Sequence, residues 1–323
     1  MRRVHVVSLG REVSALGFGC ASLGSRISAR DGLRALARAF DLGVTWYDTA
    51  PPYGDGESEE ILGRFLRDRR DKVVVCTKFG LSRPQVPLHK RLLRPLARRL
   101  VAAAPSLRRV ASRSRPLAVH AEIDPKSIEP SLKESLRRLG GDFVDVFAIH
   151  EPSAGDATSD AIFEVLIRLK EQGLIRAISL AGAEESATAA LASQKPLDFL
   201  QFSDAPSAKV SVRLRGLTAS GYAPSFVTHG VFSPTEARRI EQLRLAEPRL
   251  WLDFAERHEI SEQAPAGEIL ARFAFSNNPD GVVLASMSSK DHLESNCALA
   301  ERPPAARLAE DLRLLTTGQG RDA

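Results

Sequence analysis

The sequence predicts an α/β fold of the (β/α)8 TIM-barrel class, in which parallel strands alternate with helices around a closed barrel. Short apolar runs alternate with longer helical patterns through almost the whole chain. Some runs, such as residues 73–76, are continuously apolar, as expected for strands buried on both faces. The main alternative, a doubly wound open sheet, usually carries a glycine-rich phosphate loop after its first strand. Residues 17–24 form the junction at the end of the first run and do not match that loop, so the barrel is favoured.

Eight expected strands divide the chain at fairly regular intervals. They are the runs 15–20, 44–48, 73–78, 144–150, 175–180, 199–202, 225–229 and 281–285. The helical patterns that follow them are 31–42, 57–69, 126–139, 158–172, 184–193, 208–219, 234–258 and 290–300. Two further helices, near 264–276 and 304–315, fall outside the strict alternation. Before the first strand, alternating residues flank Ser8, Leu9 and Gly10, which predicts a β-hairpin that plugs the bottom of the barrel.

The composition indicates a single globular domain covering residues 1–323. Hydrophobic residues make up 43% and charged residues 26%, the balance of an ordinary globular protein. No stretch has the roughly eighteen uncharged apolar residues of a membrane span, and the first residues lack the apolar run of a signal peptide. The three cysteines are too few and too scattered for a disulfide framework or a zinc site. A cytoplasmic location is therefore expected.

The positive charge of the chain is concentrated in one segment. The formal net charge is +5, yet residues 81–120 contain ten Lys or Arg and no Asp or Glu. The remaining residues carry 35 basic and 40 acidic side chains. A general nucleic-acid-binding surface is therefore not expected. The segment follows the third expected strand and is far longer than a usual connection between a strand and a helix, so it is interpreted as an insertion.

Four titratable residues fall at or just after the ends of three successive strands, where this class of barrel carries its active sites. Asp48 ends the second strand and Tyr53 follows it, Lys78 ends the third, and His150 ends the fourth. A tyrosine is a poor acid–base catalyst at neutral pH unless a cation lies close by, and Lys78 would supply that cation. A lysine inside a barrel mouth needs an anionic partner, and Asp48 is placed for that task. His150 would orient a substrate carbonyl and share the proton relay.

These residues resemble the signature of the aldo-keto reductases. The stretch 48–54, Asp-Thr-Ala-Pro-Pro-Tyr-Gly, carries the resemblance, and the stretches 75–78, 147–150 and 173–178 match further motifs in order and spacing. The resemblance covers about residues 4–300 and implies an oxidoreductase that acts on the carbonyl or alcohol group of an aldehyde, a ketone or a sugar. It implies that Tyr53 donates the proton, that Lys78 lowers the pKa of Tyr53, that Asp48 pairs with Lys78, and that His150 positions the substrate. Glu57 and Glu59 are interpreted as charges that oppose a helix dipole.

The resemblance also implies a nicotinamide cofactor, NADP(H) or NAD(H), lying across the barrel mouth. The residues expected to hold it are Gly19, Cys20, Asp48, Gln201, His229, Gly230, Ser286, Ser288, His292 and Asn296.

Three departures from the family pattern affect this cofactor site. Residues 179–182 read Ser-Leu-Ala-Gly where the family usually has Gly-Val-Ser-Asn, which leaves Gln201 to hold the carboxamide. His229 stands where an aromatic ring usually stacks on the nicotinamide, and His292 stands where an arginine commonly binds a 2′-phosphate. These departures leave two interpretations open: the cofactor is bound weakly, or it is NAD(H) rather than NADP(H). The alternative function is a nucleotide-sensing regulatory module on the same barrel, with little or no catalysis.

The basic insertion begins beside the expected catalytic rim, three residues after Lys78. Residues 88–104 form a helical pattern with leucines on one side and arginines on the other, interrupted by Pro95. Three interpretations stay open. The segment is a solvated loop, or a cationic lid that recognises an acidic group on a substrate or carrier, or a surface for an anionic membrane or another partner.

Overall fold

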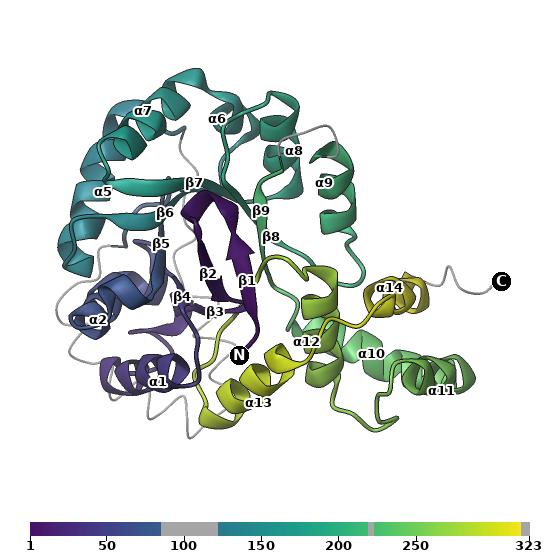
Figure 1. Ribbon diagram of the computed structural model, residues 1–323. Coiled ribbons are helices and arrows are strands. Elements are labelled where there is room, and N and C mark those ends of the chain that lie inside the picture. Colours follow the sequence, from purple (N-terminus) through teal and green to yellow (C-terminus); the bar gives the residue numbers. More distant parts are fainter. Residues whose placement is uncertain (85–121, 219–222, 318–323) are drawn as a thin grey trace.

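The computed structural model describes residues 1–84, 122–218 and 223–317. Within them, parallel strands form a closed barrel surrounded by helices, which confirms the predicted fold class (Figure 1). The barrel strands are β3 Leu16–Gly19, β4 Trp46–Asp48, β5 Val74–Phe79, β6 Val144–His150, β7 Ile175–Ala181, β8 Phe199–Ser203, β9 Ser225–His229 and β10 Val282–Ala285. Their order around the barrel is β10-β3-β4-β5-β6-β7-β8-β9.

Side chains of successive residues alternate between the barrel interior and the surrounding helices. Trp46 of β4 and Phe199 of β8 both point inward, and their ring centroids lie 5.3 Å apart. These two strands are opposite one another, because the order of the barrel separates them by equal steps in either direction. Gly17 of β3 makes room for the indole, since a β-carbon there would lie 2.6 Å from Leu284 and 3.0 Å from Trp46. The interior is therefore a packed core rather than a pore.

The N-terminal hairpin covers the end of the barrel at which the strands begin. Strands β1 Arg3–Val6 and β2 Arg11–Ser14 pair antiparallel and lie across that end (Figure 1). Val4, Val6 and Val13 are buried in the same apolar cluster as Trp46. The predicted plug is confirmed, and it leaves the opposite end of the barrel for polar side chains.

Twelve helices lie in the described residues. They are α1 Ala29–Asp41, α2 Ser58–Leu66, α5 Pro125–Leu139, α6 Ala154–Thr158, α7 Asp160–Glu171, α8 Glu184–Ala192, α9 Val210–Thr218, α10 Pro234–Ala246, α11 Pro248–Arg257, α12 Ala266–Asn277, α13 Lys290–Glu301 and α14 Leu308–Thr317. The prediction of a single helix over 234–258 was wrong. The segment forms two helices, α10 and α11, separated at Glu247, whose backbone is not helical (φ −132°, ψ 60°). The ring of Pro248 disfavours helical backbone at the preceding residue, which explains the break.

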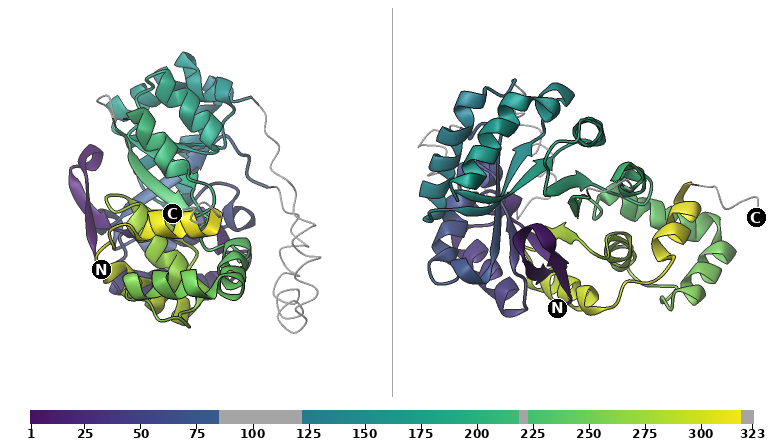
Figure 2. Two further views of the ribbon diagram at one scale, coloured as in Figure 1. Left: turned by 90° about the vertical axis from the view of Figure 1, so that its right-hand side faces the viewer. Right: turned by 45° about the horizontal axis from the view of Figure 1, so that its top comes forward.

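Helices α10, α11, α12 and α14 form a lobe beside the barrel (Figures 1 and 2). Arg313 of α14 joins this lobe to the barrel wall. Its guanidinium is buried and donates hydrogen bonds to Ser211 of α9, at 3.2 Å, and to Asn277 of α12. The lobe contains α12 and α14, which correspond to the two helices expected outside the regular alternation.

Of the basic insertion, the described part of the chain contains residues 81–84, and the helical pattern predicted at 88–104 lies outside it. Within the described ranges, none of the helices has the length and apolar character needed to cross a membrane.

Candidate active site

Lys78 and Asp48 form a buried ion pair at the carboxyl end of the barrel. They lie on the neighbouring strands β5 and β4, and their side chains are only 3% and 4% exposed. Lys78 Nζ donates to Asp48 Oδ1 and, at 3.0 Å, to the carbonyl oxygen of Thr49. Burial acts to lower the pKa of Lys78, but the Asp48 carboxylate and neighbouring acidic groups outweigh it and raise that pKa. Lys78 is therefore a permanent cation inside the barrel mouth.

A tight turn after β4 carries Tyr53 to this ion pair. Residues Tyr53–Gly56 form a 3-10 turn in which Gly54 and Asp55 have φ angles of 63° and 57°. A β-carbon on Gly54 would lie 1.6 Å from the carbonyl oxygen of Leu23, so only glycine fits at that position. The glycine that follows the tyrosine in the sequence is thus required by the turn that places the tyrosine.

Tyr53 meets both Lys78 and His150. The centroid of its ring lies 4.7 Å from Lys78 Nζ and 5.6 Å from the centroid of the His150 ring, which it contacts edge-on. Burial is the largest influence on the phenol and raises the pKa of Tyr53, while Lys78 acts to lower it and Asp48 acts to raise it. The net direction differs from the expectation of a lowered pKa, because burial outweighs the cation. The phenol is therefore protonated at neutral pH.

Gln201 contacts Asp48 from the opposite side of the barrel. It lies on β8, is 1% exposed, and its Nε2 donates to Asp48 Oδ2 at 2.8 Å and to Cys76 Sγ at 3.3 Å. The sequence assigns Gln201 to the cofactor carboxamide, whereas the structure places its amide nitrogen on the ion pair. Sequence reasoning missed this contact because a partner across a barrel leaves no signature in residue spacing.

A second buried ion pair supports the segment that carries Tyr53. Glu59 lies in the first turn of α2, where it accepts hydrogen bonds from Thr77 Oγ1 at 2.7 Å and from Arg138 Nε at 2.6 Å. The Glu59 and Arg138 side chains are 1% and 6% exposed. The interpretation of Glu59 as a charge opposing the helix dipole is therefore incomplete, because this residue also ties α2 to β5 and α5.

The start of the basic insertion is joined to the same turn. Arg83 Nε donates to the carbonyl oxygen of Gly56 at 2.8 Å, and Arg83 Nη2 donates to Glu60 Oε1 at 2.7 Å. One of the ten positive charges of the insertion thus has a structural partner beside the Tyr53 turn.

Eight of the ten residues expected to hold a cofactor lie along one side of the barrel mouth, whereas Asp48 and Gln201 lie on β4 and β8. The adjacent strands β3, β10 and β9 end in this set, which comprises Gly19, Cys20, His229, Gly230, Ser286, Ser288, His292 and Asn296. Ser286, Ser288 and His292 are exposed. Helix α13 begins at Lys290, so His292 lies in its first turn, and Ser289 accepts a hydrogen bond from the backbone N–H of His292 at 3.2 Å. The positive end of this helix dipole suits an anionic group such as a phosphate.

Cys20 and His229 differ in what they can offer to a cofactor at this edge. The Cys20 side chain is fully buried, and its carbonyl oxygen accepts a hydrogen bond from Ser58 Oγ at 2.9 Å. Burial lowers the pKa of His229, while Asp48 acts to raise it and Lys78 acts to lower it. The imidazole is therefore neutral at neutral pH and interacts electrostatically with both members of the ion pair. The edge therefore presents hydroxyls and a neutral ring beside the charged pair.

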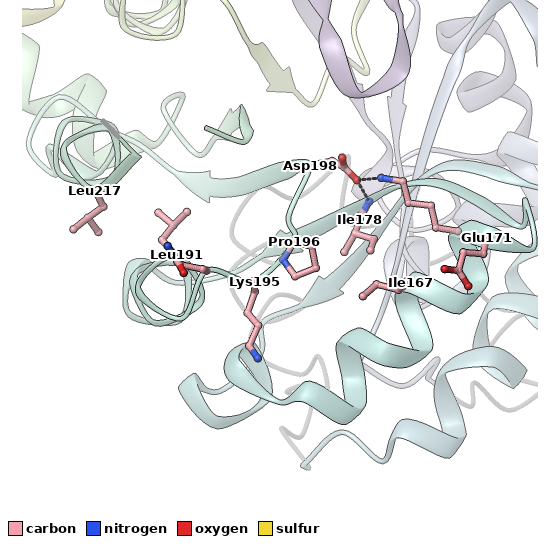
Figure 3. A pocket seen from close by; sticks show the side chains of 10 residues that line it. Ile167, Glu171, Ile178, Leu191, Lys195, Pro196, Asp198 and Leu217 are labelled. Carbon is pink, nitrogen blue, oxygen red and sulfur yellow. Dashed lines mark hydrogen bonds and ion pairs between the residues drawn. The ribbon is translucent and has the colours of Figure 1, made fainter. Parts of the chain in front are cut away.

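A separate cavity of about 650 Å³ lies outside the barrel strands, beside α7 and α8. Its lining includes Ile167 and Lys170 of α7, Leu191 of α8 and Asp198 before β8 (Figure 3). Lys170 donates to Asp198 at 2.6 Å, so these two charges satisfy each other. None of the residues that the sequence assigns to catalysis or cofactor binding lines this cavity. It is therefore distinct from the candidate active site.

Known proteins with similar sequences are oxidoreductases. The model of the Aldo/keto reductase family matches residues 15–208. D-threo-aldose 1-dehydrogenase of a Pseudomonas species is 30% identical over 253 residues, which cover 71% of this chain and 70% of that protein. An aldo-keto reductase of Schizosaccharomyces pombe whose name specifies NADP(+) is 29% identical over 200 residues, which cover 60% of this chain and 50% of that protein.

Among solved structures, the holo form of an aldo-keto reductase from Bacillus halodurans matches with a TM-score of 0.69. The match covers 98% of this chain and 96% of that one at 19% sequence identity. At this identity the likeness establishes a shared fold.

Proposed function

Because this chain belongs to the aldo/keto reductase family, we propose that it transfers hydride between a nicotinamide cofactor and the carbonyl or alcohol carbon of an aldehyde, a ketone or a sugar. Tyr53 is the general acid in reduction and the general base in oxidation. Lys78, Asp48 and His150 complete the catalytic group.

The buried Asp48–Lys78 pair against Tyr53 is the observation that carries this proposal. Taking two charges out of water is costly, and an apolar pair of similar size would close a barrel at least as well. The pair lies at the end of the barrel at which this fold carries its chemistry, and it contacts a phenol that needs a cation in order to ionise. Such an arrangement is expected where a proton must be moved.

The four residues divide the proton transfer between them. When bound, the cofactor supplies the hydride in reduction and accepts it in oxidation. In reduction, Tyr53 Oη donates its proton to the carbonyl oxygen as negative charge develops there, and Lys78 stabilises the phenolate that remains. In oxidation, the phenolate accepts the proton of the alcohol. His150, whose ring contacts that of Tyr53, orients the substrate oxygen.

The cofactor is proposed to lie along the edge formed by β3, β10 and β9. Gly19 has no side chain and would let the cofactor approach the backbone closely. Ser286 and Ser288 present hydroxyls just before the start of α13. His292 lies in the first turn of this helix and takes the place expected for an arginine, so both NADP(H) and NAD(H) are candidates. Titration with each nucleotide, followed by fluorescence or calorimetry, distinguishes them.

A nucleotide-sensing module is the second candidate function. It is favoured by the position of the Gln201 amide nitrogen on Asp48 and by the absence of polar side chains at Ala181 and Gly182, because these features leave few groups for a carboxamide. Such a module would bind the nucleotide and show no turnover with any substrate.

Replacement of Tyr53 by Phe tests the proposed activity. The variant keeps the ring and removes the proton donor, so turnover of aldoses and small aldehydes should fall by roughly 10²–10⁴-fold with little change in nucleotide affinity. Tyr47→Phe is the matched control, because that phenol is buried between the barrel strands and α1, against the carbonyl oxygens of Leu36 and Val44. An active Tyr53→Phe variant would overturn the mechanism, and a wild-type protein that binds nucleotide without turnover would favour the sensing module.

A further inference from the structure

Two contacts cross the barrel between β4 and β8. The contact between Gln201 and Asp48 is the one nearer the carboxyl ends of the strands. Below them, Trp46 and Phe199 meet from the same two opposite strands, β4 and β8. Because side chains two residues apart on a strand share a face, Asp48 and Gln201 are stacked directly on this aromatic contact. The aromatic layer thus sets the height and direction at which the amide reaches the carboxylate.

The chemistry of the two groups fixes the orientation of the amide. An ionised carboxylate only accepts hydrogen bonds, so the Gln201 nitrogen, and not its oxygen, must face Asp48. Asp48 Oδ2 receives this hydrogen bond at 2.8 Å while Oδ1 faces Lys78, and each carboxylate oxygen therefore has its own donor. A buried carboxylate that loses one of two donors is left with an unsatisfied oxygen.

We propose that Gln201 is a positioning residue for the hydride-transfer reaction, holding Asp48 so that its other oxygen stays on Lys78 beside Tyr53. This inference rests on the proposed function of Tyr53 as the acid–base group. Gln201 acts through Asp48 and need not contact the substrate.

The sign of its effect follows from the charges around Tyr53. Burial is the largest influence and raises the pKa of Tyr53; of the nearby charges, Lys78 acts to lower this pKa, and Asp48 and Cys76 act to raise it. The other titratable groups here are His150, against the Tyr53 ring, and Cys20 and His229, which interact electrostatically with Asp48 and Lys78. The amide hydrogen bond draws charge away from Asp48, so its loss strengthens the influence of the carboxylate on the phenol. The pKa of Tyr53 should then rise.

The test is a double-mutant cycle between Gln201→Met and Asp48→Asn. Methionine keeps the length of the side chain and removes the donor. Gln201→Met should raise the pKa of Tyr53 by roughly 0.5–1 unit, and the same substitution in the Asp48→Asn background should have little effect, because the carboxylate through which it acts is gone. The readouts are the pH profile of kcat for alcohol oxidation and the tyrosinate absorbance of Tyr53. That absorbance is isolated by subtracting a Tyr53→Phe protein, which is practical in a chain with three tyrosines.

Controls separate this role from a general effect on folding. Asn278 is a buried amide directly after α12 that donates to the carbonyl oxygens of Phe226 and Val282, so Asn278→Leu should lower stability and leave the Tyr53 titration unchanged. An unchanged titration in Gln201→Met, or an equal shift with and without the Asp48 carboxylate, would overturn the proposal. The absorbance titration needs no turnover, so a failure of the proposed reaction itself is recognised separately.

Discussion

The two ends of the barrel differ in the side chains that fill them: one end is filled by apolar side chains, and the other holds a buried ion pair. At the end where the strands begin, Val4, Val6 and Val13 of the hairpin are buried in one apolar cluster with Trp46. At the end where they finish, the inward positions carry Asp48, two residues beyond Trp46, and the buried partner Lys78. The alternation of side chains along a strand is the same throughout, so the difference lies in the residue types alone. One end contributes stability, and the other holds buried charge at a cost in stability.

The largest expected effect comes from removing the cation at the polar end. Lys78→Met leaves Asp48 buried without its partner, so the free energy of unfolding should fall by about 3–5 kcal/mol. The pKa of Tyr53 should rise because its nearby cation is lost, and the pH dependence of alcohol oxidation should move to higher pH. Urea denaturation and a pH profile of kcat measure the two effects.

Lys170→Met is the matched control for this prediction. Its ion pair with Asp198 is partly exposed, so its removal should cost no more than about 1 kcal/mol and leave the pH profile in place. A Lys78→Met protein whose profile coincides with that of the wild type would show that Tyr53 is not tuned by this pair.

An intermediate effect is expected at the apolar end. Val13 lies on β2 of the hairpin and is fully buried, so Val13→Ala should lower the free energy of unfolding by roughly 2 kcal/mol through lost burial and a small cavity. Turnover per folded molecule should stay unchanged, because the proposed catalytic residues lie at the opposite end of the barrel from the hairpin. Val7→Ala, at a position 81% exposed, should leave both stability and turnover unchanged. A loss of turnover in Val13→Ala would contradict the division of the barrel into a stabilising end and a reacting end.

The same contrast explains what the sequence could predict. Apolar runs and their period identified all eight barrel strands and the hairpin, because burial on both faces leaves a long, redundant pattern. The break before Pro248 was missed because the helical pattern continues through it, although the proline itself was a usable signal. Features that depend on a single strand or turn can therefore be predicted from the sequence.

Contacts that depend on closure of the barrel were not predictable. Asp48, Tyr53, Lys78 and His150 could be proposed together because each lies at or just after a strand end, and all strand ends meet in this fold. The hydrogen bond from Gln201 to Asp48 and the contact of Glu59 with Arg138 join residues far apart in the sequence, with no motif that pairs them. Their partners depend on which strands and helices face one another, which only the folded barrel determines.

The smallest effect is expected at the rim of the polar end, where the basic insertion begins. We hypothesise that its positive charges attract an acidic group on the substrate or its carrier, because residues 81–120 hold ten Lys or Arg and no Asp or Glu. Replacement of Arg91, Arg94, Arg98 and Arg99 by Gln should raise the KM for an acidic substrate and flatten its salt dependence, since such attraction weakens as salt shortens the screening length.

A small neutral aldehyde has no acidic group, so the same variant should reduce it almost as the wild type does. The matched control replaces Arg30, Arg34, Arg64 and Arg67, which are exposed on α1 and around α2, and removes the same net charge. If the control raises the KM for the acidic substrate equally, the net charge of the protein is responsible and not the insertion. If both substrates are affected alike by the insertion variant, the segment supports the active-site rim structurally. If neither is affected, the four replaced arginines take no part in substrate selection, and the hypothesis of charge attraction by the insertion is overturned.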